Sequence, residues 1–171
     1  DKFFEVFSSN KTLSDAGVAR QGLTTSDNNK FVRYWHEVDL KKINYNCHSC
    51  AETVNIRFKW FPYIKGGTFR RWYPNKEFVV NYTNNGIDIK TSVMKKYPYL
   101  KTPDFVVKNT NTYFKKGITW SDVATGDFSA RYVDNGYIYA DAGPMFFPNE
   151  DIFYLLAYMN SKVFQGCCNL I

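Results

Sequence analysis

Aromatic side chains constrain the fold of this chain more than any other feature, because they recur along its whole length. They make up 19% of the residues, with 15 Phe, 13 Tyr and 4 Trp. Large rings pack well on the pleated surface of a sheet, so this supply favours a β-rich fold over a helical one. A chain of 171 residues is also long enough to bury a substantial core. We therefore predict a folded single domain over residues 1–171.

Several short segments have the patterns expected of β-strands. Alternation of apolar and polar side chains predicts strands at residues 31–38, 55–60 and 77–82. A helical period also fits the first of these segments. Asn85-Gly86 predicts a turn into residues 87–89, and Asn135-Gly136 predicts a hairpin, because both dipeptides accept the positive φ of a tight turn. The two strands of that hairpin are expected at residues 128–133 and 137–140.

The C-terminal segment has the pattern of an amphipathic helix. Asn149 is a good N-cap, and the two acidic residues that follow suit the positive end of a helix dipole. Apolar residues from Ile152 to Val163 recur at helical spacing, and Gly166 is predicted to end the helix.

Helices and loops complete the expected fold. Ser49 is predicted to cap a short helix through Val54, and residues 97–112 are predicted to form a loop around two prolines. The expected fold class is α+β, with a twisted, mainly antiparallel β-sheet, flanking helices and the C-terminal amphipathic helix.

Positive charge is concentrated in the middle of the chain. The net charge is +6, and residues 57–76 carry six basic side chains and no acidic one. Residues 90–116 carry seven basic side chains and one acidic residue, Asp104. Such a face suggests a polyanion partner, although a solvated lysine-rich surface would have the same composition.

Residues 59–73, KWFPYIKGGTFRRWY, alternate basic and aromatic side chains more densely than any other part of the chain. Arginine pairs with phosphates, and aromatic rings can stack on exposed bases or fill a core. Lys65, Arg70 and Arg71 lie close to Gly66-Gly67 in sequence. This glycine pair would either let backbone N–H groups approach a phosphate or form an ordinary hairpin turn.

Other chemistries lack the residues that they need. His36 and His48 have no Gly-x-Ser-x-Gly sequence beside them, and no phosphate-binding glycine motif occurs. Cys47 and Cys50 have the spacing of half a zinc site, but Cys167-Cys168 does not supply the other half. We therefore predict no catalytic and no metal-binding residues. No apolar run is long enough to span a membrane, and the N-terminus does not resemble a secretory signal, so a cytoplasmic location is expected.

At residues 59–73 the sequence resembles PglX-type adenine-specific methyltransferases, which belong to bacterial BREX phage-defence systems and related restriction-modification enzymes. The resemblance extends over about residues 20–165. Five further blocks of the chain resemble the family and occur in the same order as in the family. They are QGLTTSDNNKFVR (21–33), VVNYTNNG (79–86), GITWSD (117–122), FSARY (128–132) and YLLAYMNSK (154–162). Ser26 and Pro74 depart from the family pattern, which usually has glycine at both positions.

The resemblance implies a module for recognising duplex DNA. In the family these blocks follow the catalytic domain, in a part similar to TaqI-like and type I recognition domains. The methyl-donor motif and the Asn-Pro-Pro-Tyr-type motif of the catalytic domain do not occur in this sequence. The chain is thus expected to be a target-recognition fragment of a larger enzyme, and both of its ends look like cuts. S-adenosylmethionine is expected to bind the parent's catalytic domain and not this fragment.

The expected partners are double-stranded DNA, the parent's catalytic domain and other defence-system proteins. Candidate backbone contacts are Lys65, Arg70, Arg71 and Lys76, with Gly66, Gly67 and Trp72 in the same segment. Candidate base-reading residues are Thr119, Trp120, Ser129 and Arg131. Two alternatives remain open, a protein-interaction domain that docks the catalytic half or another defence component, and a secreted glycan-binding β-domain.

Overall fold

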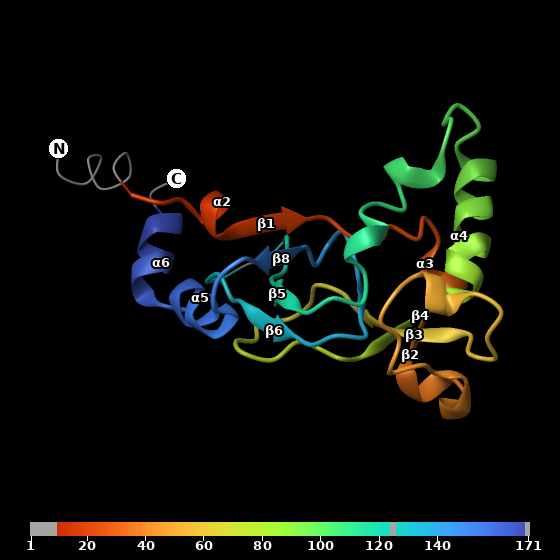
Figure 1. Cartoon of the computed structure of the whole chain (residues 1–171), viewed down its shortest axis with the longest axis horizontal. Coiled ribbons are helices and arrows are strands. Elements are labelled where there is room, and N and C mark those ends of the chain that lie inside the picture. The colour runs from red at the N-terminus through yellow and green to blue at the C-terminus, as the bar shows by residue number, and fades with distance from the viewer. Residues whose placement is uncertain (1–9, 124–125, 170–171) are drawn as a thin grey trace.

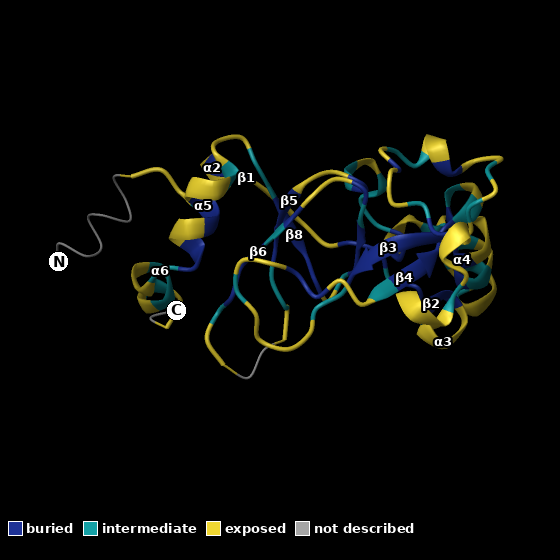
Figure 2. Ribbon diagram, turned by 90° about the horizontal axis from the view of Figure 1, so that it is seen from below, coloured by how far each residue is buried: buried dark blue, intermediate teal, exposed yellow. Residues whose placement is uncertain are grey.

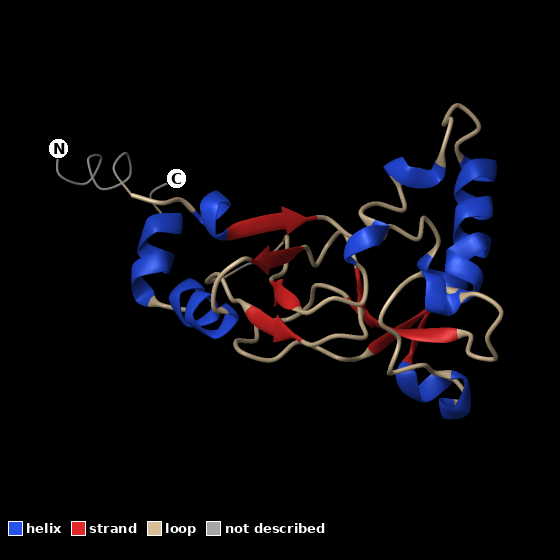
Figure 3. Ribbon diagram, in the orientation of Figure 1, coloured by secondary structure: helices blue, strands red, loops and turns tan. Residues whose placement is uncertain are grey.

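The computed structural model describes residues 10–123 and 126–169, which form two four-stranded sheets and several helices (Figures 1 and 3). The first sheet has the strand order β1-β8-β5-β6, and all of its pairs are antiparallel. Its strands are β1 (Gly17–Arg20), β5 (Gly117–Thr119), β6 (Arg131–Val133) and β8 (Met145–Pro148). The second sheet has the order β2-β4-β3-β7, in which only the β3–β7 pair is parallel. Its strands are β2 (Val32–Tyr34), β3 (Trp60–Ile64), β4 (Phe78–Asn81) and β7 (Ile138–Tyr139).

Helices lie at both ends of this pair of sheets (Figure 1). The α-helices are α2 (Leu13–Ala16), α3 (Asn28–Phe31), α4 (Thr83–Lys96), α5 (Ile152–Met159) and α6 (Lys162–Cys168). Short 3-10 helices occur at η1 (Trp35–Glu37), η2 (Leu40–Lys42), η3 (Ala51–Thr53), η4 (Pro103–Phe105) and η5 (Thr110–Thr112). The α+β class is therefore confirmed, with two mainly antiparallel sheets in place of one.

Most buried apolar side chains belong to two clusters, one around each sheet, and the cluster around the second sheet also includes Val133 and Met145 of the first. Around the second sheet, Phe61 and Val80 pack with Ile89 and Val93 of α4, and all four side chains are at most 1% exposed. Around the first sheet, Ile118 packs with residues of β8 and α5. Every residue of β3, β5 and β7 is buried, while α4 and α5 expose one face to solvent (Figure 2).

Leu23 lies within the apolar cluster around the second sheet. Its side chain is completely buried, and its backbone bridges to both Val107 and Ala140. The Leu23 N–H donates to the Tyr139 carbonyl at 2.8 Å, and the Tyr63 hydroxyl donates to the Leu23 carbonyl at 2.8 Å. The segment between β1 and α3 thus joins the second sheet through hydrogen bonds that satisfy buried polar groups.

The strand predicted at residues 77–82 is confirmed by β4, but two other predicted strands differ from the structure. The strand expected at 31–38 is shortened to β2, Val32–Tyr34. It ends there because the Tyr34 N–H donates to Glu37 Oε2 at 2.8 Å and the chain turns into η1. The strand expected at 55–60 begins where it was predicted to end, since Asn55 has a left-handed φ of 56°. The alternation nevertheless predicted correctly which side chains face solvent, since Arg57 and Lys59 are exposed.

Asn85-Gly86 does turn the chain, but into a helix. Asn84, Asn85 and Gly86 have left-handed φ values of 49°, 57° and 67°, and α4 continues from them. The expected β-segment at 87–89 is therefore wrong, because Ile89 and Val93 bury one face of a helix against the second sheet. Residues 97–112 form the predicted loop, apart from η4 and η5.

The predicted hairpin at 128–140 is also wrong, although its turn is present. Gly136 has a φ of 93°, and its N–H donates to the Phe114 carbonyl at 3.0 Å. The strands on either side of this turn join different sheets, β6 beside β5 and β7 beside β3. The turn therefore carries the chain from the first sheet to the second.

The caps of three helices differ from the prediction. Asp151, not Asn149, caps α5, because its carboxylate accepts from the backbone N–H groups of Phe153 and Tyr154 at 2.8 Å. The apolar run forms two helices, since Ser161 caps α6, and Gly166 lies inside α6. Cys50 and not Ser49 precedes η3, which is one residue later than predicted.

Substituting the cap of α5 gives a direct test of this correction. Asp151→Ala is expected to lower the free energy of unfolding by about 0.5–2 kcal/mol, because two N–H groups at the helix start lose their acceptor. Asn149→Ala is the matched control and is expected to change it by less than about 0.5 kcal/mol. Urea unfolding measures both, and an equal loss in the two variants would contradict the assignment of the cap.

Candidate nucleic-acid interface

The segment between β3 and β4, residues 65–77, forms a long loop that we call the basic loop. It leaves the second sheet and runs beside β6 of the first sheet before it returns to β4 (Figure 1). The Trp72 N–H donates to the Ala130 carbonyl at 3.0 Å, and the Tyr132 N–H donates to the Trp72 carbonyl at 2.9 Å. Trp72 has a left-handed φ of 74°. The middle of the loop is therefore fixed to the first sheet by its backbone.

A second anchor lies near the start of the basic loop. The Gly67 N–H donates to Ser121 Oγ at 3.1 Å, and that hydroxyl donates back to the Gly67 carbonyl at 3.1 Å. A Cβ atom on Gly66 would lie 2.5 Å from the Ala142 carbonyl oxygen. Neither Gly66 nor Gly67 has a positive φ, and the long loop excludes a two-residue hairpin turn at this point. The pair instead allows a close approach of two backbones.

This packing role leads to a contrast between two glycines. Gly66→Ala is expected to lower the free energy of unfolding by about 1–3 kcal/mol, because the new methyl group must displace backbone. Gly166→Ala should raise it by about 0.5–1 kcal/mol, since a Cβ at this helical position meets no atom within 4 Å. Thermal or urea unfolding measures both signs. A Gly66→Ala variant with an unchanged free energy of unfolding would contradict the close approach of the Gly66 and Ala142 backbones.

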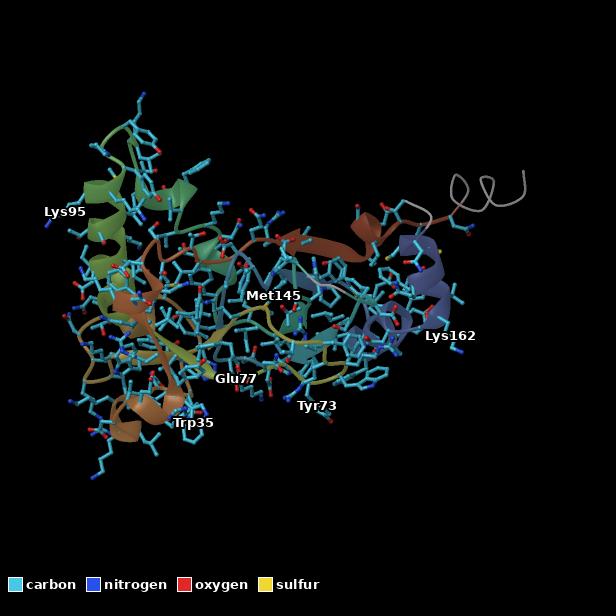
Figure 4. All side chains as sticks on the ribbon, turned by 180° about the vertical axis from the view of Figure 1, so that it is seen from behind. Trp35, Tyr73, Glu77, Lys95, Met145 and Lys162 are labelled. Carbon is cyan, nitrogen blue, oxygen red and sulfur yellow. The ribbon has the colours of Figure 1, made fainter. Side chains whose placement is uncertain are left out.

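The aromatic residues of segment 59–73 divide into two groups. Those on β3 are buried, whereas Phe69, Trp72 and Tyr73 on the basic loop are 60%, 46% and 72% exposed. Figure 4 shows Tyr73 at the edge of the molecule, away from the buried Met145. The sequence patterns left the choice between core and contact open. The structure assigns core positions to the strand part and surface positions to the loop part.

The four basic residues of the loop have different surroundings. Arg70 and Lys76 are exposed, and Lys76 Nζ lies 5.2 Å from the centre of the Tyr137 ring. Lys65 is half-buried, with Nζ 5.4 Å from the centre of the Phe78 ring. Arg71 Nη2 lies 3.7 Å from Asp127 Oδ2, in one of the two ion pairs found among the described residues. Arg70 and Lys76 are therefore the cations most available to a ligand.

The second basic segment, residues 90–116, begins on α4. Lys95 on α4 is far from Tyr73 on the basic loop in Figure 4. The positive charge of α4 therefore lies apart from that of the basic loop.

The four candidate base-reading residues are largely buried. Thr119 is 1% exposed, and its hydroxyl donates to the Pro144 carbonyl at 2.8 Å. Ser129 is 7% exposed, and the half-buried Trp120 packs against Phe128 with ring centres 6.2 Å apart. Arg131 is 1% exposed. Base contact by these residues stays a prediction, which their burial disfavours. Ser121, which the pattern analysis did not single out, instead connects the loop to the sheet.

Cys47 and Cys50 are engaged by neighbouring backbone. Cys47 Sγ donates to the Ser49 carbonyl and Cys50 Sγ to the Thr110 carbonyl, both at 3.3 Å. Burial raises the pKa of the Cys47 thiol to about 11, so the thiol is protonated at neutral pH. No group of three or more metal-ligating side chains occurs within residues 10–123 and 126–169. Among those same residues, no helix is long and apolar enough to cross a membrane.

Comparison with known proteins identifies relatives. No protein-family model matches the chain. Over 146 residues, 84% of the chain, it is 38% identical to the adenine-specific methyltransferase PglX of Lacticaseibacillus casei (strain Zhang). Over 158 residues, 90% of the chain, it is 34% identical to the adenine-specific methyltransferase BrxX of Escherichia coli O9:H4 (strain HS). The chain is homologous to a segment of PglX-type methyltransferases. It spans 12% of the length of each of these relatives.

The PglX-type pattern gains a physical explanation at one position of this chain. Ser26 stands where the pattern usually has glycine, and its φ of 59° is left-handed. An L-residue in this conformation costs about 1–2 kcal/mol, which glycine avoids. The Ser26 carbonyl accepts from Lys96 Nζ at 2.9 Å, so α4 helps to hold this turn. Pro74, the other departure, is buried in the basic loop.

Proposed function

We propose that this chain is the duplex-DNA recognition module of an adenine-specific DNA methyltransferase in a bacterial defence system. The homology to PglX and BrxX supports the parent enzyme class. The sequence holds neither the glycine-rich methyl-donor motif nor an Asn-Pro-Pro-Tyr-type motif. The proposal therefore assigns S-adenosylmethionine binding, base flipping and transfer to N6 of adenine to the parent's catalytic domain.

One observation supports DNA contact most strongly, the exposed aromatic residues beside exposed cations on an anchored loop. Phe69, Trp72 and Tyr73 leave large apolar areas in water, while the loop backbone is fixed at Gly67 and Trp72. A surface loop that is held rigidly and carries both rings and guanidinium groups is typical of a binding site.

The residues of the loop have different proposed roles. Arg70 and Lys76 hold phosphates of the duplex, with Lys65 and Arg71 behind them, and so position the module without reading sequence. Trp72 and Tyr73 pack against sugars or base edges in a groove. Base readout then depends on side chains of the loop surface, since the candidates on β5 and β6 are buried.

Binding of duplex DNA by the 171-residue chain at several salt concentrations tests the proposal. With Arg70 and Lys76 as the two phosphate contacts, the logarithm of the association constant should fall with the logarithm of salt concentration at a slope of about −1.8. A flat salt response, or no binding even at low salt, would contradict it.

A second candidate function is docking of the parent's catalytic domain through α5 and α6. Phe153, Tyr154 and Val163 are 61%, 66% and 68% exposed on these helices. Unpaired apolar faces of this kind mark protein contacts. Docking predicts that Phe153→Ser with Tyr154→Ser weakens the complex with the catalytic domain and leaves DNA binding by this chain unchanged. A complex whose interface contained Trp72 and Arg70 would instead favour docking over DNA binding at the basic loop.

A further inference from the structure

Arg131 on β6 carries a buried positive charge. Its side chain is 1% exposed, although arginine is rarely buried without an ionic partner. Arg131 Nη2 donates to Ser121 Oγ at 2.9 Å, and Nε is buried without a hydrogen-bond partner. The guanidinium therefore has a neutral hydroxyl as its partner where a carboxylate would be expected.

The surroundings of Arg131 add positive charge instead of balancing it. The ion pairs among the described residues are Lys11–Glu150 and Arg71–Asp127, and neither involves Arg131. Burial, and then the neighbouring charge of Arg70, lower the pKa of the Arg131 guanidinium. A buried charge without a counterion is strongly unfavourable, and an external anion would offset this cost.

Arg131 also lies directly beneath the anchored part of the basic loop. Its backbone bridges to Trp72, and its partner Ser121 Oγ is the hydroxyl that exchanges hydrogen bonds with Gly67. The buried guanidinium of Arg131, the Ser121 hydroxyl and the backbone of Gly67 therefore form one hydrogen-bonded network, and the exposed Arg70 lies two residues before Trp72, which bridges to Arg131. An anion that reaches this part of the loop meets charge from both arginines.

We propose that Arg70 and Arg131 form an oxyanion site for one phosphodiester group of the nucleic-acid backbone, with Arg70 in contact and Arg131 as the positioning residue beneath it. The proposal rests on the proposed function for the source of the phosphate. A guanidinium in a low-dielectric site attracts a nearby anion much more strongly than a solvated one. Arg131 thus stabilises the bound phosphate and holds Ser121 and the loop in place.

The site can be tested with inorganic phosphate as the probe. The thermal unfolding midpoint of the chain is measured in phosphate and in chloride at equal ionic strength and pH. Phosphate should raise the midpoint of the wild-type chain, and Arg70→Gln or Arg131→Gln should abolish the increase. Arg131→Lys should retain part of it, because it keeps the charge, which a purely structural role would not predict. Lys41→Gln on η2 is the charge-matched control and should leave the increase unchanged.

The affinity of the variants for duplex DNA is the second test of the site. Arg70→Gln should weaken duplex binding about tenfold or more, as expected for a lost hydrogen bond to a charged group. Arg131→Gln should also weaken it, because the buried positive charge beneath the phosphate is lost. If Arg131→Gln does not fold, Arg70→Gln, which changes an exposed residue, carries the test alone. No phosphate effect, together with unchanged DNA binding in Arg70→Gln, would overturn the site. A phosphate effect without any DNA binding would keep the anion site and refute the proposed function.

Discussion

Replacing Arg70 and Arg71 together by alanine is expected to weaken the binding of all duplexes by about 10- to 100-fold. The variant loses the phosphate contact of Arg70 and the charge of Arg71 behind it, and one lost contact should reduce the steepness of the salt slope by about 0.9. Contacts to phosphate carry no base identity, so matched and unmatched duplexes should weaken by the same factor. Fluorescence anisotropy at several salt concentrations measures the affinity and the slope together.

The control for this experiment removes the same charge elsewhere. Lys41→Ala with Lys42→Ala changes two exposed cations on η2 and should alter affinity by less than about threefold, since screening limits distant charges. The single variants separate the two arginines, because Arg71 is paired with Asp127 and Arg70 has no carboxylate partner among the described residues. Arg70→Ala should therefore have the larger effect. If the η2 control and the loop variant lose the same duplex affinity, the basic loop is not the DNA-binding site.

Leu23→Ala is expected to lower the free energy of unfolding by about 2–5 kcal/mol, the range for a large-to-small change in a tight core. Leu23 is completely buried where Val107 and Ala140 meet, and its backbone hydrogen bonds leave little freedom for the segment to collapse into the cavity. Urea unfolding followed by circular dichroism gives the midpoint and the slope of the transition.

Leu40→Ala is the matched control for this change. Leu40 is 56% exposed on η2, so the same substitution there should cost less than about 0.5 kcal/mol. A loss of stability in Leu23→Ala as small as that of the control would contradict the tight packing of Leu23 in the core. A loss confined to one of two separate transitions would show that the two sheets unfold independently.

Local patterns predicted the fold class and several elements, but not how the strands pair. The turn at Asn135-Gly136 forms because the conformation of Gly136 depends on its own backbone. Whether its flanking strands then pair with each other depends on distant partners, and Tyr132 pairs with Ile118 while Ile138 pairs with Tyr63. Strand pairing of this kind is not encoded in the spacing of a single segment.

Helix α4 shows a second limit of pattern analysis. An Asn-Gly pair predicts a tight turn between strands, yet three successive left-handed residues here lead into a helix. The helical spacing of Ile89 and Val93 was present in the sequence, but a short apolar run of this length fits both a strand and a helix. The segment forms a helix because Ile89 and Val93 are buried on one face of it against the second sheet.

The candidate site at residues 59–73 stays a prediction, and the exposure of its residues could not be predicted from the sequence. Trp60 and Trp72 occur in the same basic and aromatic pattern, but Trp60 is 9% exposed on a strand and Trp72 is 46% exposed on a loop. The difference arises from the end of β3 at Ile64, which the predicted strand at 55–60 misplaced. Ser121 and the burial of Arg131 depend on tertiary contacts between the loop and β6.

The most direct test of the account is the chemical-shift response of the backbone amides when a short duplex is added to the labelled chain. The account predicts that the largest changes cluster in residues 65–77 and at Ser121, with little change in α5 and α6. Changes confined to the exposed face of α5 and α6, or no change at a duplex concentration well above that of the protein at low salt, would contradict DNA recognition by the basic loop.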